Sequence, residues 1–115
     1  GNALYFLTVD ELISKTDVHD GRVVRVSGKL VDDSFQREGR STTSSFRLHD
    51  DQVGPSASQL NAEFVGVVPD LFFNPHSEII LEGSIGADHV FQTDNILVKC
   101  PSKYRSLEDE VQQAG

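Results

Sequence analysis

Cys100 has the most reactive type of side chain in this sequence. It is the single cysteine, and it lies in a basic segment. Lys99, Lys103 and Arg105 surround it, in a chain with 10 Lys+Arg and 18 Asp+Glu. Neighbouring cations favour the thiolate, which is the nucleophilic and metal-binding form of cysteine. Pro101 disfavours helical backbone at the residue before it, so we expect Cys100 to end a strand at an accessible rim. The alternative is a buried structural thiol, since free cysteine behaves as a small hydrophobic residue.

Tyr104 is the second residue of chemical interest, and it lies shortly after Cys100. A type I turn with Pro101 and Ser102 at its centre would return Tyr104 to the surface that carries Cys100. A tyrosine oxygen can serve as an axial ligand of haem iron. The alternative is an aromatic ring that packs on the rim of the domain. The spacing therefore permits a joint site in which one side chain offers sulfur and the other a phenolic oxygen.

The remaining reactive residue types form no recognisable catalytic or metal-binding pattern. The histidines show no helical metal spacing, so we expect structural or solvent-exposed roles for His19, His49, His76 and His89. A single cysteine excludes an internal disulfide and a multi-cysteine metal site. There is no glycine-rich phosphate loop, and the carboxylates form no acid–base pair. We therefore expect a protein that is not an enzyme, although a Cys–His nucleophilic pair stays open, because its members need not be close in sequence.

Length and composition favour one soluble globular domain. The 115 residues are 37% hydrophobic and 24% charged, and the formal net charge is -8. An acidic surface disfavours nucleic-acid binding, which depends on cations that displace counterions from phosphates. No apolar run approaches the roughly 20 residues of a membrane-spanning helix. Because the chain starts with Gly1-Asn2 and contains no methionine, we expect an upstream segment to be missing.

The N-terminal part of the chain is predicted to hold a short helix followed by a strand. Thr8 and Glu11 form the capping-box pattern that begins helices, and Asp20-Gly21 marks a turn. Residues 22–30 then alternate in polarity, which is typical of a half-buried strand. The apolar face of this strand carries Val24, Val26, Gly28 and Leu30. The glycine within it indicates a bend or a bulge.

The rest of the chain alternates between short strands and polar loops. Strands are expected at 46–48, 61–68, 77–86 and 89–99, with an irregularity near 92–95, and one helical turn at 69–73. Small sheets with glycines inside their strands tend to close into barrels that hide their edges. We therefore predict an all-β fold, a small antiparallel OB-type barrel of five to six strands with a short N-terminal helix; a small sandwich is the alternative. We expect this domain over residues 1–105 and a flexible acidic tail over residues 106–115.

Three parts of the sequence carry a family pattern. Residues 64–72 read F-V-G-V-V-P-D-L-F, residues 96–104 read I-L-V-K-C-P-S-K-Y, and residues 7–12 with 21–31 form the opening. They resemble the haem chaperones of cytochrome c maturation, the CcmE family, whose corresponding segments are Y-x-G-I-L-P-D-L-F and V-L-A-K-H-D-E-N-Y. The resemblance covers residues 5–105 and implies an OB-type barrel.

The main departure from the family lies at the attachment residue. The family's usual haem-attaching histidine is Cys100 here, and Pro101, Ser102 and Lys103 replace the acidic and amide residues that follow it. A minor branch of the family carries Cys-x-x-x-Tyr at this place, and the chain resembles that branch. A thiol can add to a haem vinyl group to give a thioether, so the replacement keeps the capacity for a covalent bond. It removes the imidazole from any release mechanism.

The resemblance implies a haem chaperone on the periplasmic side of the bacterial inner membrane, tethered by an N-terminal helix that this sequence lacks. Such a protein receives haem, holds it covalently and transiently, and delivers it to apocytochrome c, with membrane proteins of the maturation system as further partners. Matched residue by residue, Cys100 forms the haem bond and Tyr104 ligates the iron. Phe6 and Leu97 match apolar positions that flank the haem. Charge points to four possible partners for the haem propionates, namely Lys99, Lys103, Arg22 and Arg25.

The alternative function is an OB-type binding module for another ligand, an oligonucleotide or a protein, in which Cys100 is merely structural. A nucleic-acid module combines a basic groove with aromatic residues on which bases stack. In this chain acidic residues outnumber basic ones, and Phe72-Phe73 lies in a predicted helical turn. Haem therefore remains the expected ligand, and no nucleic-acid partner is expected.

Overall fold

The computed structural model describes residues 4–50, 58–100 and 111–114, the last of these as backbone. Its elements in chain order are β1 (Phe6–Thr8), α1 (Val9–Ser14), η1 (Thr16–Val18), β2 (Val24–Leu30), β3 (Gln36–Arg37), β4 (Thr43–His49), β5 (Gln59–Val65), η2 (Asp70–Phe73), β6 (Glu78–Ile85), β7 (Val90–Lys99) and β8 (Val111–Ala114). The predicted N-terminal helix is confirmed. Its capping box is complete, because the Thr8 hydroxyl accepts from the Glu11 amide at 3.2 Å and the Glu11 carboxylate accepts from the Thr8 amide at 2.9 Å.

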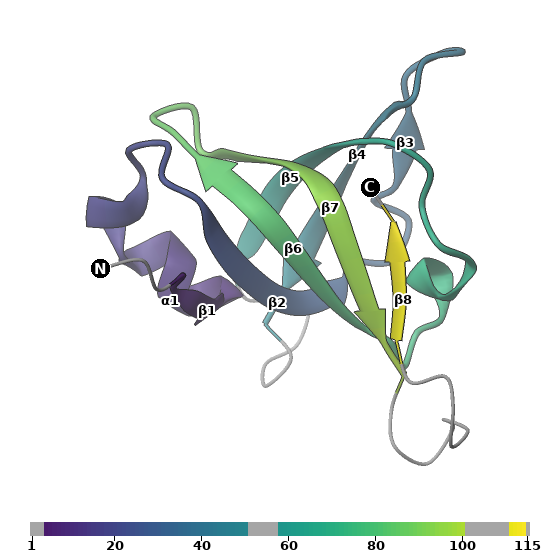
Figure 1. Cartoon of the computed structure of the whole chain (residues 1–115), viewed down its shortest axis with the longest axis horizontal. Coiled ribbons are helices and arrows are strands. Elements are labelled where there is room, and N and C mark those ends of the chain that lie inside the picture. Colours follow the sequence, from purple (N-terminus) through teal and green to yellow (C-terminus); the bar gives the residue numbers. More distant parts are fainter. Residues whose placement is uncertain (1–3, 51–57, 101–110, 115) are drawn as a thin grey trace.

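A closed barrel forms the centre of the structure (Figure 1). Its strands follow one another in the order β2, β6, β7, β5 and β4, and β4 pairs with β2 to close the ring. β1 extends the sheet beside β2, β3 pairs with β4, and β8 pairs with β7. The predicted small barrel is confirmed, and its closure excludes the sandwich. One correction concerns direction, because β5 and β7 run parallel, as do β1 and β2.

Apolar side chains from all five barrel strands fill the interior. Val26 on β2, Leu81 on β6 and Ile96 on β7 lie in one row of paired residues, and all three are 0% exposed. Aromatic rings close the packing at Phe46 and Phe72, whose centroids are 5.0 Å apart in an edge-to-face arrangement. Small barrels of this kind are filled by side chains, so the interior offers no lumen for a ligand.

The irregularity predicted near residues 92–95 is confirmed as a register shift between β6 and β7. On β6 the shift falls between Glu82, which pairs with Asn95, and Gly83, which pairs with Thr93. The Thr93 hydroxyl donates to the Glu82 carbonyl at 2.7 Å and accepts from the Asn95 amide at 3.1 Å. A Cβ atom at Gly83 would collide with the carbonyl oxygen of Gln92. Glycine and threonine together therefore hold the extra residue of β7 in place.

The polar residues 32–45 predict a long hairpin or loop, and the structure has a hairpin there, formed by β3 and the start of β4. β4 begins at Thr43 rather than at Phe46, and β3 lies before it. Ser44 occupies a buried position of β4, in step with Phe46, and this polar residue conceals the apolar alternation. At Gly28 the pairing with β6 is continuous, which excludes a bulge, and from Lys29 onward β2 pairs with β4 instead. A Cβ atom at Gly28 would lie 2.6 Å from the His49 carbonyl oxygen, so glycine permits close approach of two strands.

β8 is an element that the sequence did not indicate. It pairs antiparallel with Ile96–Lys99 of β7, on the edge that β5 leaves after Thr93. Figure 1 shows β8, in yellow, along the C-terminal half of β7. The segment 106–115 was expected to be a flexible tail, and it contains this strand at Val111–Ala114. The other residues of the tail lie outside the described part of the chain, and the domain boundary after residue 105 stays a prediction.

Candidate functional site

Cys100 lies at the end of β7, as the sequence indicated. The strand ends at Lys99, and Cys100 follows it directly as a free, partly exposed thiol. Lys99 is exposed and pairs across the ladder with Glu78 of β6. Tyr104 and Lys103 lie outside the described residues, so the turn that would return Tyr104 to this surface stays a prediction. The structure thus fixes the sulfur at an accessible end of the barrel.

Leu97 points to the outside of the barrel, three residues before the cysteine. Its neighbours Ile96 and Val98 are fully buried in the core, whereas Leu97 is partly exposed. Across the ladder it pairs with Ile80 of β6, which is 6% exposed and does not belong to the central core cluster. The two residues form an apolar pair on the outer face. The alternation of residues 77–86 contained this signal, because Ile80 breaks the expected polar outer face.

Phe6 lies on the same outer face, but on its opposite margin. It is 56% exposed, pairs with Arg25 of β2, and belongs to a row that continues through Glu82 to Asn95. Three inter-strand spacings separate β1 from β7, which is about 14 Å. Figure 1 also shows β1 on the side of the barrel away from β8. The structure therefore does not bring Phe6 and Leu97 into contact, and they border a surface made by β2 and β6.

Both arginines proposed for the propionates are already paired with carboxylates. Arg25 Nε donates to Glu82 Oε1 at 2.9 Å, on the surface between Phe6 and Leu97. Arg22 binds Asp20 through two parallel bonds, Nε to Oδ1 at 3.0 Å and Nη2 to Oδ2 at 2.8 Å. Such bidentate pairs are well oriented and charge-assisted. Lys99 has no ion-pair partner among the described residues, so it is the more available cation.

The Arg22–Asp20 pair has a measurable consequence. The hydrogen bond from the Arg22 side chain, followed by one from its backbone, lowers the pKa of Asp20 from 3.8 to about 2. Replacing Arg22 by alanine removes the side-chain bond and keeps the backbone bond, so the pKa of Asp20 is expected to rise toward its ordinary value, as measured by NMR titration of the carboxyl carbon. A lowered pKa stabilises the folded state above the unfolded value of 3.8, and this contribution disappears as pH falls toward 2. An unchanged Asp20 titration in the variant would contradict the pairing.

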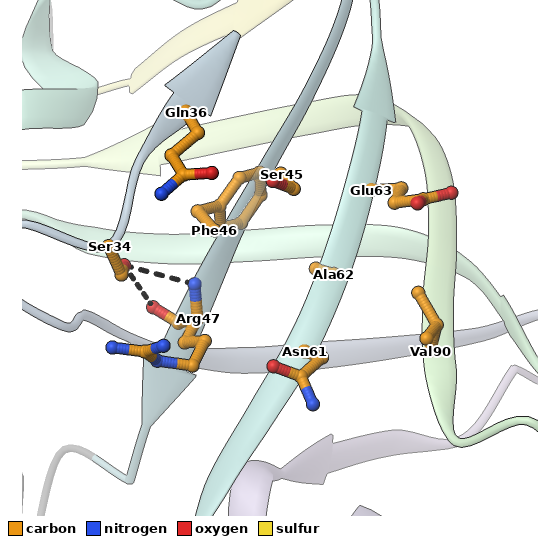
Figure 2. Close-up of a pocket in the computed structure, with 9 residues that line it drawn as sticks. All are labelled: Ser34, Gln36, Ser45, Phe46, Arg47, Asn61, Ala62, Glu63 and Val90. Carbon is orange, nitrogen blue, oxygen red and sulfur yellow. Dashed lines mark hydrogen bonds between the residues drawn. The ribbon is translucent and has the colours of Figure 1, made fainter. Parts of the chain in front are cut away.

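A shallow hollow lies elsewhere on the barrel, on the outer face of β4 and β5 (Figure 2). It has a volume of about 190 Å³, and Ser34, Phe46, Asn61 and Val90 are among its lining residues. The Ser34 hydroxyl accepts from the Arg47 amide at 3.0 Å, which joins the segment before β3 to β4. Val90 begins β7 and Cys100 follows its end, about 30 Å away along the strand. This hollow is therefore separate from the candidate site.

The candidate site consists of the Cys100 thiol at a strand end, the outward apolar pair Leu97–Ile80 beside it and the exposed cation of Lys99. A family model described as "CcmE domain" matches residues 3–107. The chain belongs to the CcmE family. Relatives include the cytochrome c-type biogenesis protein CcmE of Halorhodospira halophila, 30% identical over 93% of this chain and 67% of that protein. The corresponding protein of Methylococcus capsulatus is 34% identical over 93% of this chain and 65% of that protein.

A solved structure extends the CcmE assignment to the fold. The solution NMR structure of the OB-fold domain of the haem chaperone CcmE from Desulfovibrio vulgaris matches with a TM-score of 0.58 and 27% identity. The match covers 70% of this chain and 89% of that one. The predicted OB-type barrel is thereby confirmed. This CcmE chain spans about two thirds of the length of the curated relatives, and within its described residues no helix is long and apolar enough to cross a membrane.

Proposed function

We propose that this chain is a haem chaperone that carries its cargo on the outer surface of the barrel, attached through Cys100. One observation carries the proposal. The thiol is partly exposed and directly follows β7, at the position where the resemblance places the haem-attaching residue. A thiol at a fixed strand end can meet a large planar substrate, whereas a thiol in the filled core cannot. The relatives' names, which refer to cytochrome c-type biogenesis and to a haem chaperone, support haem as the cargo.

The attachment is an addition of the thiol to a haem vinyl group. The sulfur bonds to one vinyl carbon, and the thiol proton ends on the other, so an S–C and a C–H bond form while the S–H bond and the vinyl π bond break. The step consumes no oxidant or reductant. Lys99 directly precedes the thiol in the sequence and is exposed. Release is the reverse elimination, after which thiols of the acceptor add to the same vinyl groups.

The outer face of β6 and β7 offers the apolar contact that a planar ring needs. Leu97 is partly exposed close to the attachment point, while its cross-strand partner Ile80 is 6% exposed and supports it from below. A tetrapyrrole laid over Leu97 extends toward β2 and Arg25. A propionate that reaches Arg25 must compete with Glu82, whereas Lys99 has no competing ion pair within the described residues. Lys103 is a further candidate of the same kind. Phe6 lies far enough away to contact only the distal edge of the cargo.

Compartment and partners follow from the family rather than from the fold. We propose that the chain acts on the periplasmic side of the bacterial inner membrane, held there by an N-terminal membrane anchor. It takes haem from membrane proteins of the maturation system and delivers it to apocytochrome c. The protein supplies binding and positioning rather than an enzymatic turnover, because the haem bond is made by its own side chain and must be broken at each delivery.

The proposal is tested by mixing the purified protein with haem and extracting it with acidified organic solvent. Coordinated haem leaves the protein under these conditions, whereas a thioether survives. We expect haem to remain bound and the intact mass to rise by one haem per chain. A peptide map should place the adduct on the peptide that contains Cys100. Binding of oligonucleotides with strong salt dependence, together with inertness toward haem, would support the alternative OB-type module.

Replacing Tyr104 by phenylalanine separates iron ligation from attachment. The variant keeps the aromatic ring and removes the oxygen, so we expect the thioether to form while the absorption spectrum of the ferric complex changes, because the axial ligand sets the electronic state of the iron. The matched control is Tyr5→Phe, since Tyr5 is the other tyrosine of the chain and lies before β1. A ferric spectrum that is identical in Tyr104→Phe and wild type would show that another group ligates the iron.

A further inference from the structure

A second set of chemically capable side chains lies at the far end of the barrel from Cys100. His19 follows η1, and His89 directly precedes β7. Their ring centroids are 5.8 Å apart, with an interplanar angle of 79°. The two residues are separated widely in the sequence, so their proximity is a product of the fold. Both line a cavity of about 330 Å³ between α1, the start of β5 and the turn from β6 to β7.

The tautomer of His19 is determined by its hydrogen bond. Nε2 lies 2.7 Å from the carbonyl oxygen of Leu12, and because a carbonyl only accepts, Nε2 carries the proton. In the neutral ring, Nδ1 therefore holds a lone pair. Histidines that ligate metals characteristically donate their other ring N–H to a carbonyl or a carboxylate, which fixes the ring and its tautomer. His19 is thus held in the way that metal-ligating histidines are held.

His89 is held in a conformation that side-chain-bearing residues rarely adopt. Its φ angle is +63°, in the left-handed region. The turn is closed by a hydrogen bond from the His89 amide to the Gly86 carbonyl at 3.1 Å. Asp88 Oδ1 accepts a further bond from the Val90 amide at 3.3 Å. Strained backbone of this kind concentrates at functional sites. The imidazole of His89 lies beside the ring of His19, and His89 is exposed to solvent.

We propose that His19 and His89 together bind one divalent transition-metal ion of the type that imidazole prefers, such as Zn²⁺. An ion bound in the plane of each ring lies ~3.2 Å from each centroid, so it can bridge centroids up to ~6.4 Å apart. Among the described residues no group of three His, Cys, Asp or Glu side chains gathers, so water completes the coordination. Ser58 and Asn61, on the same cavity wall, are suitable partners for that water. The net charge of -8 favours cation binding to the protein in general.

The test is a titration of the full chain with ZnCl₂, monitored through the imidazole proton resonances. We expect the resonances of His19 and His89 to shift together with a stoichiometry of one ion per chain, while those of His49 and His76 stay unchanged. His19→Gln and His89→Gln should each weaken binding at least ~10-fold, as the loss of a ligand would, whereas the control His76→Gln should not. Protons compete for the same nitrogens, so affinity should fall as the pH is lowered.

Three results would overturn the proposal. The first is a titration in which Zn²⁺ shifts neither His19 nor His89, and the second is equal affinity in both glutamine variants and wild type. The third is Zn²⁺ binding that depends only on Cys100. The variant Cys100→Ser distinguishes such binding from the two-histidine site. Circular dichroism of each variant verifies that it is folded. Because the cavity lies at the opposite end of β7, these results are independent of haem attachment.

Discussion

Replacing Cys100 by alanine is expected to reduce haem that resists acid–organic extraction to background. No other residue of the chain can form a thioether, because Cys100 is the single cysteine. Weak, reversible haem binding should persist, since the apolar pair Leu97–Ile80 and the exposed Lys99 are unchanged. The measurement is the haem that remains after extraction, with the intact mass of the protein as a second readout. The variant should fold normally, as Cys100 lies outside the core cluster.

A matched variant makes this result more specific. Cys100→Ser keeps the size and polarity of the side chain but lacks sulfur, so it should also give no extraction-resistant haem. Ser84→Cys restores a thiol elsewhere on the barrel, on β6, when combined with Cys100→Ala, and this double variant should stay unmodified if position 100 itself matters. Extraction-resistant haem in Cys100→Ala would place the attachment at another residue and refute the central part of the proposed function.

Replacing Val26 by aspartate is expected to unfold the barrel. Val26 is 0% exposed and packs in one row with Leu81 of β6 and Ile96 of β7, so the new carboxylate has no cation and no water. An unpaired buried charge costs several kcal/mol or more, which is comparable to the total stability of about 5–15 kcal/mol of a typical domain. Far-UV circular dichroism and thermal denaturation measure the effect.

The control for this prediction lies three residues away on the same segment of chain. Val23 is 51% exposed, just before β2, and Val23→Asp introduces the same charge into solvent. Surface substitutions of this kind usually change stability by less than about 0.5 kcal/mol. A folded Val26→Asp protein with a melting temperature near that of wild type would mean that the interior of the barrel is not arranged as described.

The parts of the fold that sequence alone could predict are those with strong local signals. The capping box at Thr8 and Glu11 depends on neighbouring residues only, and the alternation on β2 and β6 follows directly from a buried face. The start of β4 had no such signal, because Ser44 is a polar residue at a buried position and its segment therefore resembles a loop in sequence. β8 depends on a long-range pairing with β7, and its acidic, weakly apolar surroundings do not reveal that partner.

The candidate site likewise has features that the sequence could predict and features that it could not. The position of Cys100 at a strand end could be predicted, because Pro101 and the preceding alternation are local. The distance between Phe6 and Leu97 could not, since it depends on how many strands lie between β1 and β7. The sequence analysis also did not predict the ion pairs of Arg25 with Glu82 and of Arg22 with Asp20. Arg25 and Glu82 meet only through the pairing of β2 with β6, whereas Asp20 and Arg22 are near neighbours whose spacing offered a signal.

The filled interior of the barrel has a consequence for the timing of haem exchange. Core residues such as Phe64, Phe91 and Val98 are 0% exposed, and a cargo that lies outside them can arrive and leave without any opening of the strands. The rate of handover is then decoupled from the slow, rare opening motions that expose barrel amides to solvent. The amides of Val26 and Leu81 should therefore stay strongly protected in both the empty and the loaded protein, so the barrel acts as a rigid support whose motions do not gate exchange.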